Sequence, residues 1–257
     1  MEHANLQMLV AVVVLSFLIL YRIFSARAGR QIYIRKIAGL NAIDEAVGRA
    51  TEMGRPMLFH PGVADFRDIG TLAAMGVLGH VAKIGARMGT KVIVITAIPV
   101  TVPIAEDIVR QSYASEGRPE LFDSEDIRFL AAGNDQLALA SAALMKEEGT
   151  ASHFYFGNYD YTSLLFTEIG QHHGAIQIAG TDQYFQVPFF IASCDYTVIG
   201  EELYAASAYL TREPTMLGSM IGQDYGKIVV LIIILLGVIA TSLGLAELYS
   251  RVVGIYK

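Results

Sequence analysis

Residues 228–246, "IVVLIIILLGVIATSLGLA", form a run of nineteen residues without a charge. A helix needs about 20 apolar residues to cross roughly 30 Å of hydrocarbon, so this run predicts a membrane-spanning helix. A second apolar stretch, 6–24, meets the same requirement if Arg22 extends to the lipid head groups. The alternative for each run is a buried core helix. Basic residues follow the first run rather than precede it, which favours an uncleaved signal anchor over a cleaved signal peptide.

The distribution of basic residues predicts the orientation in the membrane. Only Glu2 and His3 are charged or titratable before the first span, whereas the segment after it is rich in arginine and lysine: Arg22, Arg27, Arg30, Arg35 and Lys36. Under the positive-inside rule the central part of the chain is cytoplasmic and both termini lie outside. The predicted segments are a first transmembrane helix (6–24), a basic juxtamembrane segment (25–40), a cytoplasmic domain (41–213), a juxtamembrane linker (214–227), a second transmembrane helix (228–246) and an outer tail (247–257).

Between the spans, short β-rich runs alternate with longer helical patterns. The strands are predicted at 56–60, 91–97, 127–131, 152–156, 175–179 and 196–200, and the helices at 42–53, 67–88, 102–117, 134–148, 161–173, 184–193 and 201–212. Regular alternation of this kind requires right-handed crossovers and a mostly parallel sheet with helices on both faces. The sequence therefore predicts an α/β domain with a doubly wound, Rossmann-like sheet.

Two groups of small residues are candidates for helix–helix contact. The helix predicted at 67–88 holds several glycines, each of which costs about 1 kcal/mol relative to alanine, and close packing is the usual compensation. That packing is either against the domain's own sheet or against a second subunit through Gly76 and Gly79. In the last span, Gly237, Thr241 and Gly244 are predicted near one face, where a neighbouring helix can approach closely.

Acidic and amide side chains follow the predicted strands where a ligand would bind. In open parallel sheets, ligands lie beyond the carboxyl ends of the strands. The loops there supply six candidate ligand-binding residues: Asn134, Asp135, Asp160, Gly180, Thr181 and Asp182. Asp and Asn at such turns also serve as helix caps, and both interpretations stay open. In "AGTDQYFQVPFF" (179–190) the aromatic side chains are expected to pack on the sheet or on a neighbour.

Strong catalytic and cofactor motifs are missing from the sequence. There is no Gly-x-Gly-x-x-Gly after the first strand, no phosphate-binding Gly-x4-Gly-Lys-Ser/Thr, no Gly-x-Ser-x-Gly and no His-Glu-x-x-His. The single Cys194 excludes an internal disulfide and a cysteine metal cluster. We predict no cofactor, no metal and no catalytic residue; whether the protein is an enzyme stays open, and the missing motifs favour a non-enzymatic protein. The central domain is acidic, which argues against nucleic acid as a partner.

Several long segments resemble a family of uncharacterised bacterial membrane proteins that share a domain of unknown function. The resemblance is carried by "IRKIAGLNAIDEAVGRATEMGRPMLFHPG" (34–62), "AIQIAGTDQYFQVPFFIASCDYTVIGEELYAASAYLTREP" (175–214) and "LGSMIGQDYGK" (217–227). It covers about residues 31–247. It implies a bacterial membrane protein, and it assigns no activity and no catalytic residue.

Two functions are consistent with these observations. The first is a non-enzymatic, membrane-anchored subunit of a homo-oligomeric or larger membrane assembly, with the lipid bilayer and other membrane subunits as partners. The second is a membrane-tethered sensor or enzyme that binds a small molecule or nucleotide at the carboxyl ends of the strands. The glycine-rich helix, the aromatic segment and the small residues of the last span favour the first.

Overall fold

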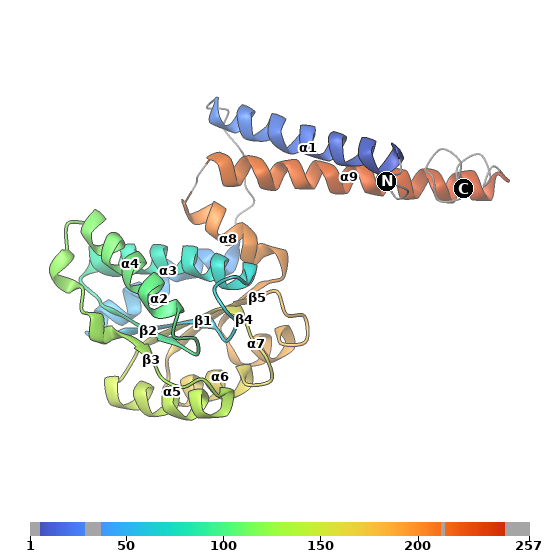
Figure 1. Ribbon diagram of the computed structural model, residues 1–257. Coiled ribbons are helices and arrows are strands. Elements are labelled where there is room, and N and C mark those ends of the chain that lie inside the picture. Colours follow the sequence, from blue (N-terminus) through green and yellow to red (C-terminus); the bar gives the residue numbers. More distant parts are fainter. Residues whose placement is uncertain (1–5, 29–36, 212–213, 245–257) are drawn as a thin grey trace. The chain divides into compact units, whose positions relative to one another are not determined.

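The computed structural model describes residues 6–28, 37–211 and 214–244. The chain divides into two compact units (Figure 1). One unit, within 1–34 and 212–257, holds the helices α1 (Leu6–Arg27) and α9 (Pro214–Ser242). The other unit, 35–211, holds a six-stranded sheet and seven α-helices in its described residues.

The sheet is entirely parallel, as the alternation of strands and helices predicted. Its strands are β1 (Met57–Gly62), β2 (Val92–Thr96), β3 (Ile127–Phe129), β4 (Ser152–Asn158), β5 (Ile176–Thr181) and β6 (Tyr196–Ile199). They lie in the order β3-β2-β1-β4-β5-β6, the order of doubly wound dinucleotide-binding sheets. β1, β2 and β5 are buried along their whole length, and β4 is buried up to its last residue, Asn158, because helices cover both faces.

Two sets of helices cover the two faces of the sheet. The helices are α2 (Ala38–Glu52), α3 (Ile69–Met88), α4 (Thr101–Ser115), α5 (Asn134–Glu148), α6 (Ser163–His172), α7 (Val187–Ser193) and α8 (Glu201–Thr211). Side chains of α2, α3, α4 and α8 share one hydrophobic cluster, and side chains of α5, α6 and α7 share the other. Successive residues of β1 enter opposite clusters, Phe59 the first and Leu58 the second, because side chains alternate along a strand.

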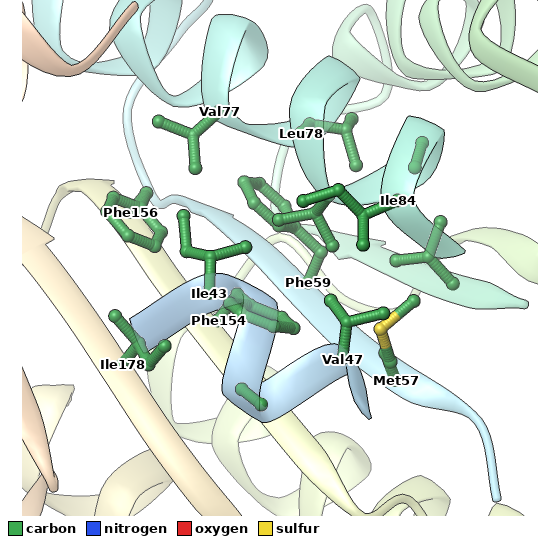
Figure 2. Close-up of a cluster of buried hydrophobic side chains, with 14 of the residues drawn as sticks. Ile43, Val47, Met57, Phe59, Val77, Leu78, Ile84, Phe154, Phe156 and Ile178 are labelled. Atoms are coloured by element: carbon green, nitrogen blue, oxygen red, sulfur yellow. The ribbon is translucent and has the colours of Figure 1, made fainter. Parts of the chain in front are cut away.

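The larger core lies between α2, α3 and the central strands. Figure 2 shows Phe59, Phe154 and Phe156 of β1 and β4 facing Ile43 and Val77 of the two helices. The rings of Phe59 and Phe156 are stacked with centroids 6.1 Å apart. All five side chains are fully buried, and burying each contributes roughly 1.5–3 kcal/mol. This packing positions the N-terminus of α3 at the carboxyl edge of the sheet.

α1, α3 and α9 are each long and apolar enough to cross a membrane. α3 has 67% of its apolar window buried, so it is a core helix of the α/β domain, whereas the windows of α1 and α9 are only 6% buried. α9 runs without a break from Pro214 to Ser242. The segment 214–227, for which the sequence predicted a linker, is therefore helical. The predicted tail, 247–257, lies outside the described residues, as do residues 29–36 of the predicted basic segment.

Candidate functional site

The strand order reverses between β1 and β4, where a doubly wound sheet ordinarily opens a ligand crevice. Here the two strand ends stay in contact. Gly62 has φ 88° and a Cβ there would lie 2.5 Å from the carbonyl oxygen of Asn158. Gly157 has φ 121°, and a Cβ built there would likewise lie too close to the carbonyl oxygen of Pro61. The Val63 N–H then donates to the Asn158 carbonyl at 2.9 Å. Glycine at both positions thus lets the two backbones approach closely at the strand reversal.

The N-terminus of α3 faces two carboxylates of the chain itself. Asp68 caps the helix, with its Oδ1 accepting from the Thr71 N–H at 3.1 Å. A Cβ built on Gly70 would lie 3.0 Å from Oδ1 of Asp68 and 3.4 Å from Oδ1 of Asp182. A helix N-terminus ordinarily attracts an anionic ligand. In this domain the side chains of Asp68 and Asp182 lie where such a ligand would bind.

A tyrosine of α8 holds Asp182 in place. The Tyr204 hydroxyl donates to Oδ2 of Asp182 at 2.5 Å, and the Gln183 side-chain amide donates to Oδ1 at 3.2 Å. Partial burial raises the pKa of Tyr204, and the hydrogen bond to Asp182 and the charges of Asp182 and Asp68 raise it further. The hydroxyl therefore stays protonated and remains a donor. We refer to Asp68, Asp182 and Tyr204 as the switch-point cluster.

The structure divides the six predicted ligand residues into two groups. Gly180, Thr181 and Asp182 end β5 beside the switch-point cluster; a Cβ on Gly180 would strike the ring of Phe156, so its role is close packing. The Thr181 hydroxyl accepts from the Gln183 N–H at 3.1 Å, a turn contact.

The second group joins the loops after β3 and β4. The Asn134 side-chain amide donates to Oδ2 of Asp160, whose Oδ1 accepts from the N–H and hydroxyl of Thr162 at 3.1 and 2.9 Å. The charge of the neighbouring Asp135 raises the pKa of Tyr161. Gly133 is the N-cap of α5, so neither Asn134 nor Asp135 is its cap. Both groups thus have partners within the chain, and among the described residues no three His, Cys, Asp or Glu side chains converge as a metal ion would require.

A buried histidine lies next to the strand reversal. Nδ1 of His60 accepts from the Gly62 N–H at 3.0 Å and lies 2.9 Å from the Tyr159 hydroxyl. The proton is therefore on Nε2, which is buried without a hydrogen-bond partner. Burial lowers the pKa of His60 to about 3, so the ring is neutral at physiological pH. Its surroundings are aromatic, with the Phe166 ring centroid 4.8 Å away.

The glycines predicted to contact another subunit lie along a groove between α3 and α4. The groove has a volume of about 420 Å³ and is lined by Gly76, Gly79, His80 and Lys83 of α3 and by Ile108 and Gln111 of α4, among others. At Gly79 the Ser112 hydroxyl of α4 donates to the carbonyl oxygen at 3.2 Å. A Cβ on Gly79 would lie 3.4 Å from the Ile108 side chain. Close packing of α4 within the same domain thus explains Gly79.

Of the three small residues predicted on one face of the last span, Gly237 and Thr241 share a face of α9, whereas Gly244 does not. Gly244 lies two residues beyond the end of α9 with φ 76°, so it is a turn residue past the helix. The Thr241 hydroxyl donates to the Gly237 carbonyl at 2.8 Å within the helix. The glycines that do contact a helix are Gly218, Gly222 and Gly226, which pack on α1. Their spacing of four residues was the sequence signal for that contact.

The fold and this site define a class of protein: a doubly wound parallel α/β domain carried between two helices that are long and apolar enough to cross a membrane. The chain belongs to the family described as domain of unknown function (DUF6754), which matches residues 1–252. The comparisons with curated proteins and with solved structures give no match. The predicted relationship to an uncharacterised domain family is therefore confirmed.

Proposed function

We propose that this protein is a non-enzymatic, membrane-anchored assembly subunit whose α/β domain docks a protein partner at the carboxyl edge of its sheet. One observation carries the proposal: a patch of exposed apolar side chains beside the switch-point cluster. It consists of Ile69 (66% exposed), Leu72 (51%), Tyr184 (72%), Phe185 (79%) and Ile199 (40%). We call it the carboxyl-edge patch. Exposed apolar patches on soluble domains commonly mark interaction sites.

Contacts between its segments make the patch continuous. Gly70, next to Ile69, approaches Asp182, and Tyr184 follows Asp182 by two residues. The Tyr184 ring in turn lies 3.6 Å from a Cβ built on Gly200, next to Ile199. Large aromatic anchors surrounded by polar side chains are typical of protein interfaces. A partner with an apolar anchor and basic flanking residues fits this surface, because Asp68 and Asp182 beside the patch are acidic.

The acidic side chains at the N-terminus of α3 support docking of a protein over binding of a phosphate-bearing cofactor. The usual ligand position at the N-terminus of α3 is taken by Asp68 and Asp182, so an anionic cofactor meets repulsion there. We place the protein in the bacterial cytoplasmic membrane, with the α/β domain in the cytoplasm and both termini outside. The arginines in the last two turns of α1, Arg22 and Arg27, support this orientation.

The test compares two exposed apolar surfaces of one domain. The full chain is extracted from native membranes in mild detergent, and the mass of the particle is measured for wild type, Ile69→Ser with Phe185→Ser, and Leu139→Ser. Leu139 is 72% exposed but lies on α5. We expect only the patch variant to lose mass, at unchanged thermal stability. A wild-type particle of one chain, or equal effects of both changes, contradicts the proposal.

A second candidate function rests on the switch-point cluster. Two carboxylates held near one helix N-terminus by a protonated tyrosine suit a cationic ligand better than a phosphate. A sensor of a divalent cation or a small amine would show ligand-dependent thermal stabilisation of the full chain, and Asp182→Asn would abolish it. Absence of any shift with Mg²⁺, Ca²⁺, spermidine and nucleotides would remove this candidate.

A further inference from the structure

The groove between α3 and α4 is a hollow on the surface of the α/β domain, where the two helices lie side by side (Figure 1). Its volume of about 420 Å³ falls within the range of roughly 300–1,000 Å³ that is usual for small-molecule sites. Ser112 joins the two walls through its hydrogen bond to the Gly79 carbonyl oxygen. Both helices also pack into the larger hydrophobic core, so the fold itself holds the walls in place.

One end of the groove is apolar and has a floor of glycine. Gly76 and Gly79 line it without side chains, and the buried Met75 lies next to them in α3. Ile108 of α4 lines the opposite side. Glycine lets a ligand approach the helix backbone closely, and the thioether of methionine makes favourable contacts with aromatic rings. This end therefore suits a planar apolar group.

The other end of the groove is polar. Lys83 lies about two turns beyond Gly76 in α3, and Ser115 lies about two turns beyond Ile108 in α4, which is about 10 Å in each case. The two helices run in the same direction, because each follows a strand of one parallel sheet. Lys83 and Ser115 therefore lie at the same end, about 10 Å from the apolar end.

Lys83 gives the groove a positive charge and forms no ion pair within the described part of the chain. It is the only charged side chain among the described lining residues, and it is exposed. The nearby Arg87 is already engaged, since its Nε and Nη2 donate to the two carboxylate oxygens of Glu116 at 3.2 and 3.1 Å. An anion in the groove would give Lys83 a charge-assisted hydrogen bond.

His80 adds a neutral hydrogen-bonding group one turn before Lys83. Burial lowers the pKa of His80; the charge of Asp44 in α2 raises it, and the charges of Lys83 and Arg87 lower it. The imidazole is therefore uncharged at pH 7.5 and has one N–H to donate. The groove thus offers one full positive charge and one neutral donor, which matches a monoanion better than a phosphate dianion.

We propose that the groove between α3 and α4 binds a small monocarboxylate with a planar apolar body. The carboxylate pairs with Lys83 and accepts from His80, and the apolar body lies on Gly76 and Gly79 beside Met75. A ring joined to a carboxylate by a short chain spans the distance of about 10 Å between the two ends. The site adds a ligand-binding function to the proposed docking function and does not depend on it.

Protection of an introduced cysteine tests the proposal with the full chain in native membrane fragments. Cys194, the single cysteine of the chain, is replaced by serine. Ser115→Cys then places a thiol at the polar end of the groove, and Leu139→Cys places one on α5, where the side chain is 72% exposed. The measured quantity is the rate of alkylation by a charged maleimide, and the probe is 4-phenylbutyrate.

We expect 4-phenylbutyrate to slow alkylation at position 115 at least about 5-fold, with half of the effect at about 1 mM or below, and to leave position 139 unchanged. The neutral 4-phenylbutanamide and the ringless butyrate should each protect at least about 10-fold more weakly. Absence of protection at position 115 up to about 10 mM, equal protection at position 139, or equal protection by either control compound would overturn the proposal.

Substitutions of Lys83 test the charge pairing. Lys83→Gln should raise the concentration for half-protection at least about 5-fold, because the carboxylate loses a charge-assisted hydrogen bond, whereas Lys83→Arg keeps the charge and should stay within about 2-fold of wild type. Lys146→Gln removes an exposed lysine of α5 and should have no effect. An unchanged value in Lys83→Gln, a loss as large in Lys83→Arg, or an equal change in Lys146→Gln refutes the assignment. Particle mass reports docking and cysteine protection reports the groove, so either proposal can fail without the other.

Discussion

Lowering the pH from 7.5 to 5.0 should destabilise the α/β domain through two buried histidines, His60 and His153. Burial lowers the pKa of each imidazole from 6.5 to about 3, because a charged ring would lose its hydration. His153 bonds to the Thr150 hydroxyl at 2.7 Å, and the charges of His173 and Arg55 lower its pKa further, against a Gln177 hydrogen bond that raises it.

The sign and the size follow from proton linkage. Because the folded pKa lies below the unfolded value, the stabilising contribution of the neutral rings is complete above pH 6.5. It is lost as the pH falls from 6.5 towards 3. At pH 5.0 protonation of one histidine favours the unfolded state by about 2 kcal/mol, and of two by about 4 kcal/mol. A domain stability of about 5–15 kcal/mol is typical, so the loss is large.

The assay measures urea unfolding of the full chain in detergent by tyrosine fluorescence and circular dichroism at both pH values. His60→Asn and His153→Asn each keep an acceptor near the place of Nδ1 and remove the titration. Each variant should therefore lose about 2 kcal/mol less between the two pH values than wild type. His172→Asn changes an exposed histidine and should behave as wild type. The carboxylates titrate in every variant and in wild type, so their contribution cancels when a variant is compared with wild type. A loss in both buried-site variants equal to that of wild type would refute the reasoning.

Five further substitutions, two of them controls, test the packing. Gly222→Ala should separate α1 from α9 and lower their protection from proteolysis, whereas Gly226→Ala should be milder, because its Cβ meets a flexible side chain at 2.9 Å rather than backbone. Gly85→Ala should lower the thermal midpoint of unfolding, since its Cβ would lie 2.7 Å from a backbone carbonyl oxygen. Gly48→Ala places its Cβ in open space. It should raise the free energy of unfolding in urea by up to about 1 kcal/mol, because alanine has the higher helix propensity. Tyr113→Phe leaves a buried N–H without its 2.9 Å acceptor and should cost about 1–3 kcal/mol in the same assay.

The architecture was predictable because each element has its own periodic signal. All six strands begin within one residue of the expected position, since apolar runs bounded by turn residues fix a strand locally. The α5 helix has the predicted bounds, Asn134–Glu148. The leading helix begins earlier, at Ala38 rather than 42, with Ile37 at its N-cap position.

The site was predictable only in part, since its contacts join distant segments. The loops after the strands do meet in pairs, as Asn134 and Asp160 show. No local signal connects Tyr204 with Asp182, which are 22 residues apart and joined by the packing of α8. The contact of α9 with α1 was readable from the spacing of Gly218, Gly222 and Gly226, but the polar residues between them interrupted the apolar pattern and suggested a linker.

The two helices of the α1–α9 pair are synthesised at different times. Between Arg27 and Pro214 lie roughly 190 residues, and a ribosome adds about 5–20 residues per second, so α1 waits about 10 to 40 s for its partner. During that interval the backbone around Ile19 and Ile23, which later meets glycine, is open to other membrane helices. The complete α/β domain emerges before α9 does. The two ends of the chain therefore come together last, around a domain that has already had time to fold.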